Sequence, residues 1–189
     1  TIFRGATLVY TNGNPITKGL SDTFLFQFLG QGYIVGIPFP VIIMFIVFIV
    51  LYVLLHKTAF GKSVYAIGGN EKAAYISGVK LNKVKIIIYS ISGIMASISG
   101  LIITSRLSSA QPTAGASYEM DAIAAVVLGG TSLSGGKGRI LGTLIGALII
   151  GVLNNGLNII GVSAFWQQVV KGVVILIAVL IDRFKVVKQ

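Results

Sequence analysis

Polar side chains that could bind a solute interrupt the apolar stretches in the C-terminal part of this sequence. Asn154 and Asn158 lie within an uncharged run, 140–160, and Gln167 lies in the next run. Spaced four residues apart, the two asparagines would share one face of a helix. An amide inside an apolar medium is costly unless it has a hydrogen-bond partner or water. The pattern predicts either a polar stripe along a translocation path for a hydroxyl-rich solute, or hydrogen bonds that join helices.

Two further features of these runs concern how helices would pack. Gly142 and Gly146 form a small-residue pair on the other face of the 140–160 run, which favours close helix contact. A second stripe of small residues follows helical spacing in the run 84–104, and it predicts the same kind of packing: Ser90, Gly93, Ser97, Gly100 and Thr104. Because a long apolar stem lets lysine reach the bilayer surface, we expect Lys171 to extend to the outer membrane interface.

Residues 132–139 are rich in glycine and superficially similar to a phosphate-binding loop. Such a loop needs a glycine at the position held here by Thr131, and a serine or threonine where Gly138 stands. The sequence therefore predicts that this chain does not bind ATP. The glycines instead favour a bent or gating backbone before the next helix, at four positions: Gly129, Gly130, Gly135 and Gly136.

Enzymatic chemistry has few candidate residues in this sequence. The chain has no cysteine, and His56 is its single histidine. Thiol catalysis, disulfides and metal sites built from cysteine or several histidines are therefore excluded. Without a convincing pair of acids in an apolar run either, we expect no catalytic residue, no metal site and no cofactor.

The elements that must position these residues are membrane helices. Of the 189 residues, 54% are hydrophobic and 11% are charged, with a mean hydropathy of +0.91. One soluble core of this size could not bury so much apolar surface. Apolar runs long enough for spans are expected at 34–55, 84–104, 140–160 and 165–181, with a short one at 119–133. We predict an all-α polytopic bundle with about five crossings, one of them short or broken.

The distribution of positive charge predicts the orientation of these crossings. The segment 56–85 carries six lysines and one acid, and the C-terminal tail carries Arg183, Lys185 and Lys188. Basic segments between spans mark the cytoplasmic side, so both should be cytoplasmic. If the short run 119–133 is re-entrant, the last two crossings invert and the tail lies outside. The net charge of +10 is explained in this way, and no nucleic-acid partner is expected.

A short capped helix is predicted within the basic segment. Asn70 is a suitable N-cap, Glu71 suits the positive end of a helix, and Gly78 is a suitable C-terminal stop. About two turns of helix are marginal without a surface to lie against. The small residues Ala73, Ala74, Ser77 and Gly78 cluster on one face. The helix could dock into a partner through this face, or it could be an ordinary surface helix.

At this segment the sequence becomes recognisable. The run Gly68-Gly69-Asn70-Glu71, followed by Ala73-Ala74 and Ser77-Gly78-Val79, resembles the coupling-loop motif of ABC permeases for ribose and other monosaccharides. The similarity continues through further motifs and covers essentially the whole chain: Arg106–Leu133, Gly135–Ile149 and Asn154–Asn158.

The resemblance implies a permease subunit of an ABC sugar importer in a bacterial inner membrane. Two permease copies would surround one path, ATP-binding cassette subunits would dock on the coupling helix from the cytoplasm, and a periplasmic sugar-binding protein would dock outside. The implied ATPase-coupling residues are Asn70, Glu71, Ala73, Ala74, Ser77 and Gly78. Residues 1–189 would then form a single transmembrane domain with a cytoplasmic coupling loop, 56–85, and N-terminal helices would be missing.

A secondary transporter or a channel for a small polar solute is the alternative function. Ion-coupled carriers usually hold acids or charged pairs within the membrane. Here the acids near apolar runs are Glu119 and Asp121, at the edge of the short run. The sequence therefore favours the ATP-driven permease.

The predicted orientation can be tested because the chain has no cysteine. A cysteine at Asn14→Cys should react with a membrane-impermeant thiol reagent in intact cells. A cysteine at Lys72→Cys should react only after lysis, because the segment 56–85 is expected to be cytoplasmic. Labelling of Lys72→Cys from outside the cell would show that the real topology is the reverse of the predicted one.

Overall fold

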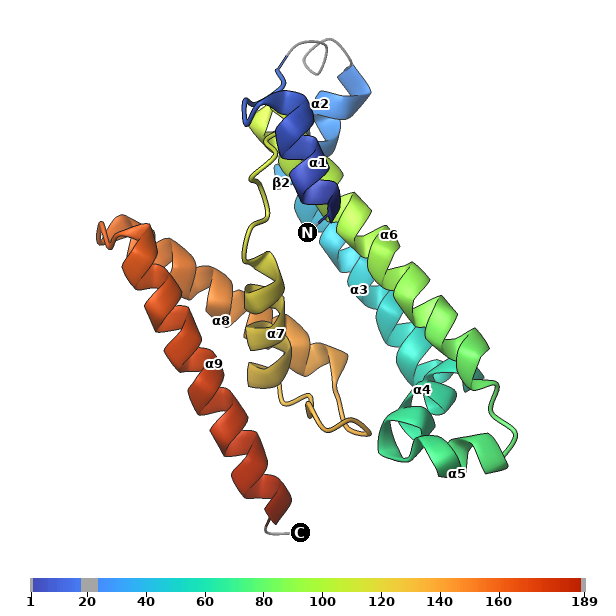
Figure 1. The fold of residues 1–189 in the computed structure, drawn as a ribbon. Coiled ribbons are helices and arrows are strands. Elements are labelled where there is room, and N and C mark those ends of the chain that lie inside the picture. Colours follow the sequence, from blue (N-terminus) through green and yellow to red (C-terminus); the bar gives the residue numbers. More distant parts are fainter. Residues whose placement is uncertain (1, 18–23, 188–189) are drawn as a thin grey trace. The chain divides into compact units, whose positions relative to one another are not determined.

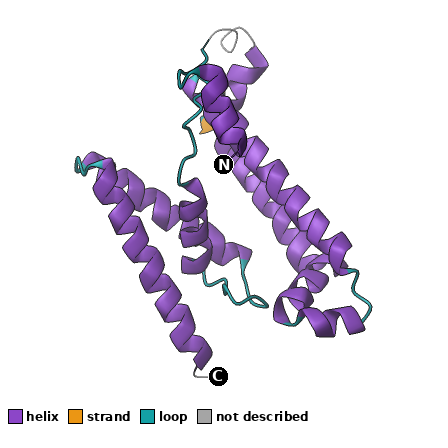
Figure 2. Cartoon of the chain, in the orientation of Figure 1, coloured by secondary structure: helices purple, strands orange, loops and turns teal. Residues whose placement is uncertain are grey.

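The protein is described by a computed structural model that covers residues 2–17 and 24–187, and in this part of the chain nearly all regular structure is helical (Figures 1 and 2). The elements, in chain order, are α1 (Ile2–Thr11), α2 (Phe24–Gln31), β1 (Tyr33–Ile34), β2 (Ile37–Pro38), α3 (Phe39–Lys57), α4 (Ala59–Gly69), α5 (Glu71–Ile76), α6 (Leu81–Leu107), α7 (Tyr118–Leu128), α8 (Ile140–Ile159) and α9 (Ala164–Val187). The all-α fold class is confirmed. Lys188, which was assigned to the cytoplasmic tail, lies outside the described residues.

Three of the described helices are long and apolar enough to cross a membrane: α3, α6 and α8. Within α9, the stretch Ala164–Ile177 counts as a shorter apolar helix. The helix α7 has 11 residues, which at 1.5 Å per residue extend about 16 Å, against a hydrocarbon core of about 30 Å. The predicted short segment is therefore a real helix that cannot span a bilayer alone.

The helix of the first apolar run, 34–55, begins only at Phe39, a late start that the prolines near the beginning of the run favour. The residues just before it belong to a hairpin in which β1 pairs antiparallel with β2. The turn uses Val35 and Gly36, both with positive φ. Proline has no amide hydrogen and a fixed φ, so it is tolerated in the first turn of a helix but not inside it. Accordingly α3 begins between Pro38 and Pro40.

Two helices were missed by the sequence analysis. The helix α4 lies in the segment that we expected to be a loop before the capped helix, and α2 lies in the segment 11–33 that reads as a loop. Glycine disfavours helix interiors, and α4 contains Gly61, Gly68 and Gly69. The cap at Thr58, whose Oγ1 accepts a hydrogen bond from the Gly61 amide at 3.3 Å, and tight packing around these glycines stabilise α4 despite that preference.

The described chain forms two compact units. The first contains Thr1–Val50 and Asn82–Ala116, and the second contains Leu51–Leu81 and Ser117–Gln189. In the first unit, α2 packs closely on the end of α6. A side chain at Gly30 would collide with Ser105 and Arg106, and the Gln31 Nε2 donates to the Ser105 carbonyl at 3.2 Å.

The two predicted small-residue surfaces differ in the structure. In the second unit, Gly142 and Gly146 of α8 press against the backbone of α7 at Gly129 and Ala125. A methyl group at either glycine would overlap those backbone atoms, so this pair is a packing device. In the first unit, by contrast, the α6 stripe is mostly exposed, and its glycines, Gly93 and Gly100, face open space.

Candidate functional site

Three polar side chains from three helices meet in the second unit. Asp121 comes from the first turn of α7, Asn154 from α8 and Lys171 from α9. The Lys171 Nζ lies 2.8 Å from the Asp121 Oδ2, and the Asn154 Nδ2 donates to the same oxygen at 3.3 Å. The side chains of Lys171 and Asp121 are 19% and 18% exposed. These contacts form a partly buried polar cluster, which we call the Asp121 cluster.

Lys171 has a partner that we did not predict. We expected its side chain to extend to the membrane interface, and in the structure its ammonium group is paired with a carboxylate on another helix. The counter-charge, Asp121, lies 50 residues away in the sequence. An ion pair in a low-dielectric environment is strongly favoured over two separate charges, so Lys171 turns toward α7.

The other predicted path residues form a second contact. The Gln167 Nε2, near the start of α9, donates to the Asn158 Oδ1 and to the Val162 carbonyl, each at 2.8 Å. This contact joins α8 to α9 across the turn between them. Each predicted asparagine therefore makes a hydrogen bond to another helix, Asn154 to α7 and Asn158 to α9.

A pocket of about 320 Å³ opens beside the Asp121 cluster between α7 and α8. Its polar lining includes Tyr118, Asp121 and Asn154, and the rest is small or aliphatic. The core of this unit lies next to it, where Ala124, Ala125 and Ile150 are buried. The sequence analysis named Asn154, Asp121 and Lys171 but did not predict that Asp121 and Lys171 pair with each other. The sequence did contain a signal for this pair, because an acid and a lysine in two apolar runs can neutralise each other.

The short helix α5 has the two ends that the sequence predicts. The Asn70 Oδ1 accepts a hydrogen bond from the Ala73 amide at 3.0 Å and caps the N-terminus of α5. At the other end Gly78 has a φ of 84°. The Gly78 amide donates to the Tyr75 carbonyl at 2.9 Å and the Val79 amide donates to the Ala74 carbonyl at 3.0 Å. This pair of bonds is a Schellman motif.

The small-residue face of α5 is divided between the protein interior and the surface. Ala74 is only 4% exposed within this chain, whereas Ala73, Ser77 and Gly78 are exposed. The helix instead presents Tyr75 and Ile76, which are 69% and 84% exposed. Together with Glu71, Lys72 and Leu81 they line a surface pocket of about 540 Å³. The sequence analysis missed this apolar pair, although two large apolar residues in a lysine-rich segment were visible.

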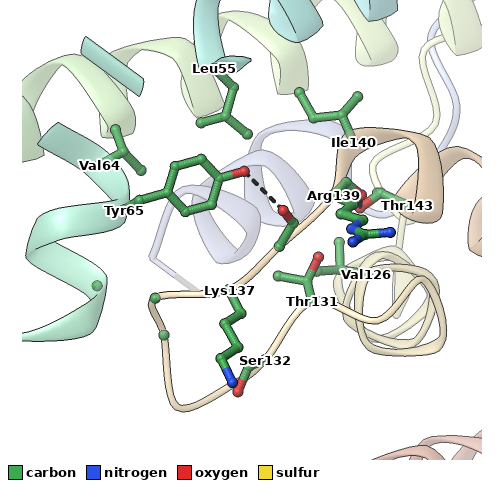
Figure 3. A pocket seen from close by; sticks show the side chains of 14 residues that line it. Leu55, Val64, Tyr65, Val126, Thr131, Ser132, Lys137, Arg139, Ile140 and Thr143 are labelled. Carbon is green, nitrogen blue, oxygen red and sulfur yellow. Dashed lines mark hydrogen bonds between the residues drawn. The ribbon is translucent and has the colours of Figure 1, made fainter. Parts of the chain in front are cut away.

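The glycine-rich segment after α7 contacts α4 (Figure 3). Gly130, Gly135 and Gly136 have φ values of 81°, 90° and 74°, in the left-handed region that favours glycine, whereas Gly129 is right-handed. The backbone of Gly68 in α4 lies against Gly135 and Gly136 without room for a side chain.

A hydrogen bond reinforces this contact. The Tyr65 hydroxyl of α4 donates to the Gly138 carbonyl at 2.9 Å, as Figure 3 shows. A pocket of about 340 Å³ lies beside it, with Leu55, Thr131 and Arg139 among its lining residues. The helix α4 is thereby joined to the loop that leads into α8.

Comparison with known proteins identifies the class of this chain. It belongs to the family described as the permease component of the branched-chain amino acid transport system, whose sequence model matches residues 2–179. With its apolar helices, the chain is therefore a multi-pass membrane protein of this family.

Individual relatives in this family are named for ribose. The chain is 68% identical over 185 residues to the ribose import permease protein RbsC of Bacillus subtilis (strain 168), covering 98% of this chain and 57% of that relative. It is 59% identical to the protein of the same name from Escherichia coli (strain K12), covering 97% and 58%. The protein of the same name from Haemophilus influenzae is 57% identical, and the match covers 97% of this chain and 57% of that relative. The chain thus spans less than two thirds of the length of these curated relatives. No solved structure matches it.

The N-cap of α5 can be tested locally. Replacing Asn70 by alanine removes a side-chain bond that is worth about 1 kcal/mol in a helix, so the Ala73 amide should exchange its hydrogen roughly fivefold faster. Asn70→Ser restores a capping oxygen and should restore slow exchange. Hydrogen–deuterium exchange measures both variants. Equal exchange in Asn70→Ala and the unmodified protein would show that the cap does not stabilise α5.

Proposed function

We propose that this chain forms the larger part of the membrane-spanning subunit of an ABC importer that carries ribose or a similar monosaccharide into a bacterial cell. The observation that carries the proposal is the 68% identity to a ribose import permease along 98% of the chain. The chain contributes the helices and the coupling segment, and a partner subunit hydrolyses ATP. No cofactor, metal or nucleic acid is required.

The polar groups of the second unit support a sugar rather than a branched-chain amino acid, which the family description names. A path for an aliphatic side chain is expected to present apolar surface. Here Asn154, Asn158 and Gln167 place amides at the α7–α8–α9 contacts, and amides suit a solute rich in hydroxyl groups. We propose that these three residues line the translocation path while also joining the helices.

The assembly we propose has two copies of the permease, ATP-binding cassette subunits on the cytoplasmic side, and a sugar-binding protein on the periplasmic side. The segment 56–85 and the C-terminus are cytoplasmic, because both are rich in basic residues. The short helix α7 and the glycine-rich segment after it then form one broken crossing, with Gly129, Gly130, Gly135 and Gly136 as its bent or gating part. Irregular backbone at such a depth is tolerated where protein covers it.

One observation favours the alternative of an ion-coupled carrier. The Asp121–Lys171 ion pair is the kind of charged pair that secondary transporters hold among their helices, and it escaped the sequence analysis. The two functions differ in their energy source. The alternative requires an ion gradient, whereas the proposed importer requires ATP and a binding protein.

Reconstitution separates these two functions. The full-length permease should be assembled in liposomes with its ATPase and its ribose-loaded binding protein. We expect uptake of labelled ribose to require ATP on the side of the membrane where the ATPase is bound. Ionophores should have no effect on this uptake. Uptake that persists without ATP but stops when an ionophore dissipates the ion gradient would support the carrier instead.

The coupling segment is the proposed contact with the ATPase. Asn70 and Glu71 fix the start of α5, and the motif around Ser77 and Gly78 fixes its end. Buried Ala74 holds the helix against its own chain, and Ala73 lies on the exposed side. The exposed apolar pair, Tyr75 and Ile76, then supplies the surface that enters a groove on the partner.

Removing the exposed apolar pair tests this contact. Burying each side chain in an interface is worth about 1.5–3 kcal/mol, so Tyr75→Ala with Ile76→Ala should lower ribose-stimulated ATP hydrolysis at least tenfold. Membrane insertion should be unaffected, since neither side chain is buried within this chain. Lys62→Ala, at an exposed position of the neighbouring α4, is the control and should stay within about twofold. Full stimulation in the double variant would place the ATPase contact elsewhere.

A further inference from the structure

We propose that Asp121 and Asn154 form a binding site for two hydroxyl groups of the sugar in transit, with Lys171 as the positioning residue that holds Asp121. The inference rests on the proposed function and specifies which atoms meet the substrate. It assigns a role to the ion pair that neither the family nor the named relatives supply.

Two acceptor oxygens of the cluster are buried without a hydrogen bond in the described structure: the Asp121 Oδ1 and the Asn154 Oδ1. Each belongs to a side chain whose other polar atom is bonded. Buried polar atoms in native proteins nearly always have a partner, and leaving one unpaired costs free energy. Two such atoms on neighbouring side chains are acceptors for a donor group in the pocket that they line.

The chemistry of the cluster fixes which atom of Asn154 is the free one. The Asp121 Oδ2 already faces the Lys171 ammonium group at 2.8 Å, and a carboxylate in such a pair only accepts hydrogen bonds. The Asn154 side chain must therefore turn its amide nitrogen toward Asp121, as it does at 3.3 Å. Its carbonyl oxygen is left as an acceptor.

The pocket beside these oxygens has a size and lining suited to a small polar solute. Its volume of about 320 Å³ lies at the small end of the range for ligand pockets, about 300–1,000 Å³. Asp121 and Asn154 both line it, and Tyr118 adds a phenol. Ala122 and Ile150 supply apolar surface, which suits the C–H faces of a sugar ring.

Charge balance selects a neutral donor for this site. Lys171 neutralises Asp121, so a second cation would gain little there and would lose its hydration. An anion would face a carboxylate and an amide oxygen, both acceptors. An aliphatic side chain would leave both oxygens unpaired. Hydroxyl groups satisfy both oxygens without adding charge, and a monosaccharide carries several on neighbouring carbons.

Lys171 acts through Asp121 rather than by contact with the sugar. An unpaired carboxylate among membrane helices is unstable as a charge. The bond to Lys171 occupies the Asp121 Oδ2 and leaves the Asp121 Oδ1 for the pocket. The ion pair therefore sets both the charge and the orientation of the acceptor.

The proposed site can be tested by combining a substitution of Asn154 with sugars that lack one hydroxyl group. In the reconstituted importer, at sugar concentrations that saturate the binding protein, uptake of ribose is compared with that of its monodeoxy analogues for the unmodified permease and for Asn154→Leu. We expect ribose uptake to fall about fivefold in Asn154→Leu, the value of one hydrogen bond. For one deoxy analogue, uptake by the unmodified permease should be lower than ribose uptake by the same factor. Uptake of that analogue by the Asn154→Leu variant should not be lower still.

A matched control lies one residue along the same helix. Asn155 is exposed and lies outside the pocket, so Asn155→Leu should leave the ratio between ribose and every deoxy analogue unchanged. If Asn154→Leu prevents assembly, Asn154→Ala removes the same acceptor without adding bulk, and the same ratios are measured. Equal losses for all sugars in these variants would mean that Asn154 only joins helices, and the proposed site would be wrong.

Exchanging the two charges tests the role of Asp121 separately. The double variant Asp121→Lys with Lys171→Asp keeps an ion pair between α7 and α9 but moves the carboxylate away from its present place. We expect assembly to persist and discrimination between ribose and deoxy analogues to be lost. Unchanged discrimination would overturn the site. A failure of the unmodified importer to take up ribose would refute the proposed function instead, and the two failures are therefore distinguishable.

Discussion

A charge placed among membrane helices must be neutralised by the protein, because lipid offers no partner. In the second unit this constraint is met by the Lys171–Asp121 pair, and the contacts around it depend on that pair. The bond fixes α9 against α7, and Asn154 of α8 donates to the same carboxylate oxygen. One oxygen atom thus joins three helices. The remaining atoms of Asp121 and Asn154 are then directed to the pocket between α7 and α8.

The close approach of α7 and α8 makes this convergence possible. Gly142 and Gly146 allow the backbone of α8 to lie directly on Gly129 and Ala125 of α7. Small residues at such contacts increase dispersion between helices, which in lipid replaces the hydrophobic effect as a driving force. A larger side chain at either glycine would separate the helices and draw Asn154 away from Asp121. The packing pair and the polar cluster therefore depend on each other.

Within the same unit, the coupling segment is held against the loop that leads into α8. The contact of Gly68 with Gly135 and Gly136 is backbone against backbone, and the Tyr65 hydroxyl adds a hydrogen bond to the Gly138 carbonyl. Such a contact has little freedom to slide, since no flexible side chain lies between the two segments. The contact therefore ties the position of α4 to the start of α8, the helix that carries Asn154.

The sequence by itself determined what depends on local pattern and composition. Apolar runs gave the long helices, since length and hydropathy suffice for a span. Asn70 and Gly78 gave the ends of α5, since caps act within a few residues. The sequence also identified polar side chains that need hydrogen-bond partners: Asn154, Asn158 and Gln167. Spacing along the chain did not show which residues those partners are.

Only the tertiary structure decided the contacts between distant residues. The helix α4 forms although its glycines disfavour it, because those glycines permit packing that outweighs a local preference. Ala74 was placed on a docking face by helical spacing, yet the structure buries it and exposes Ile76. The ion pair of Lys171 was not predicted, because its counter-ion lies 50 residues away in the sequence. An ion pair depends on separation in space, which a pattern along one helix does not contain.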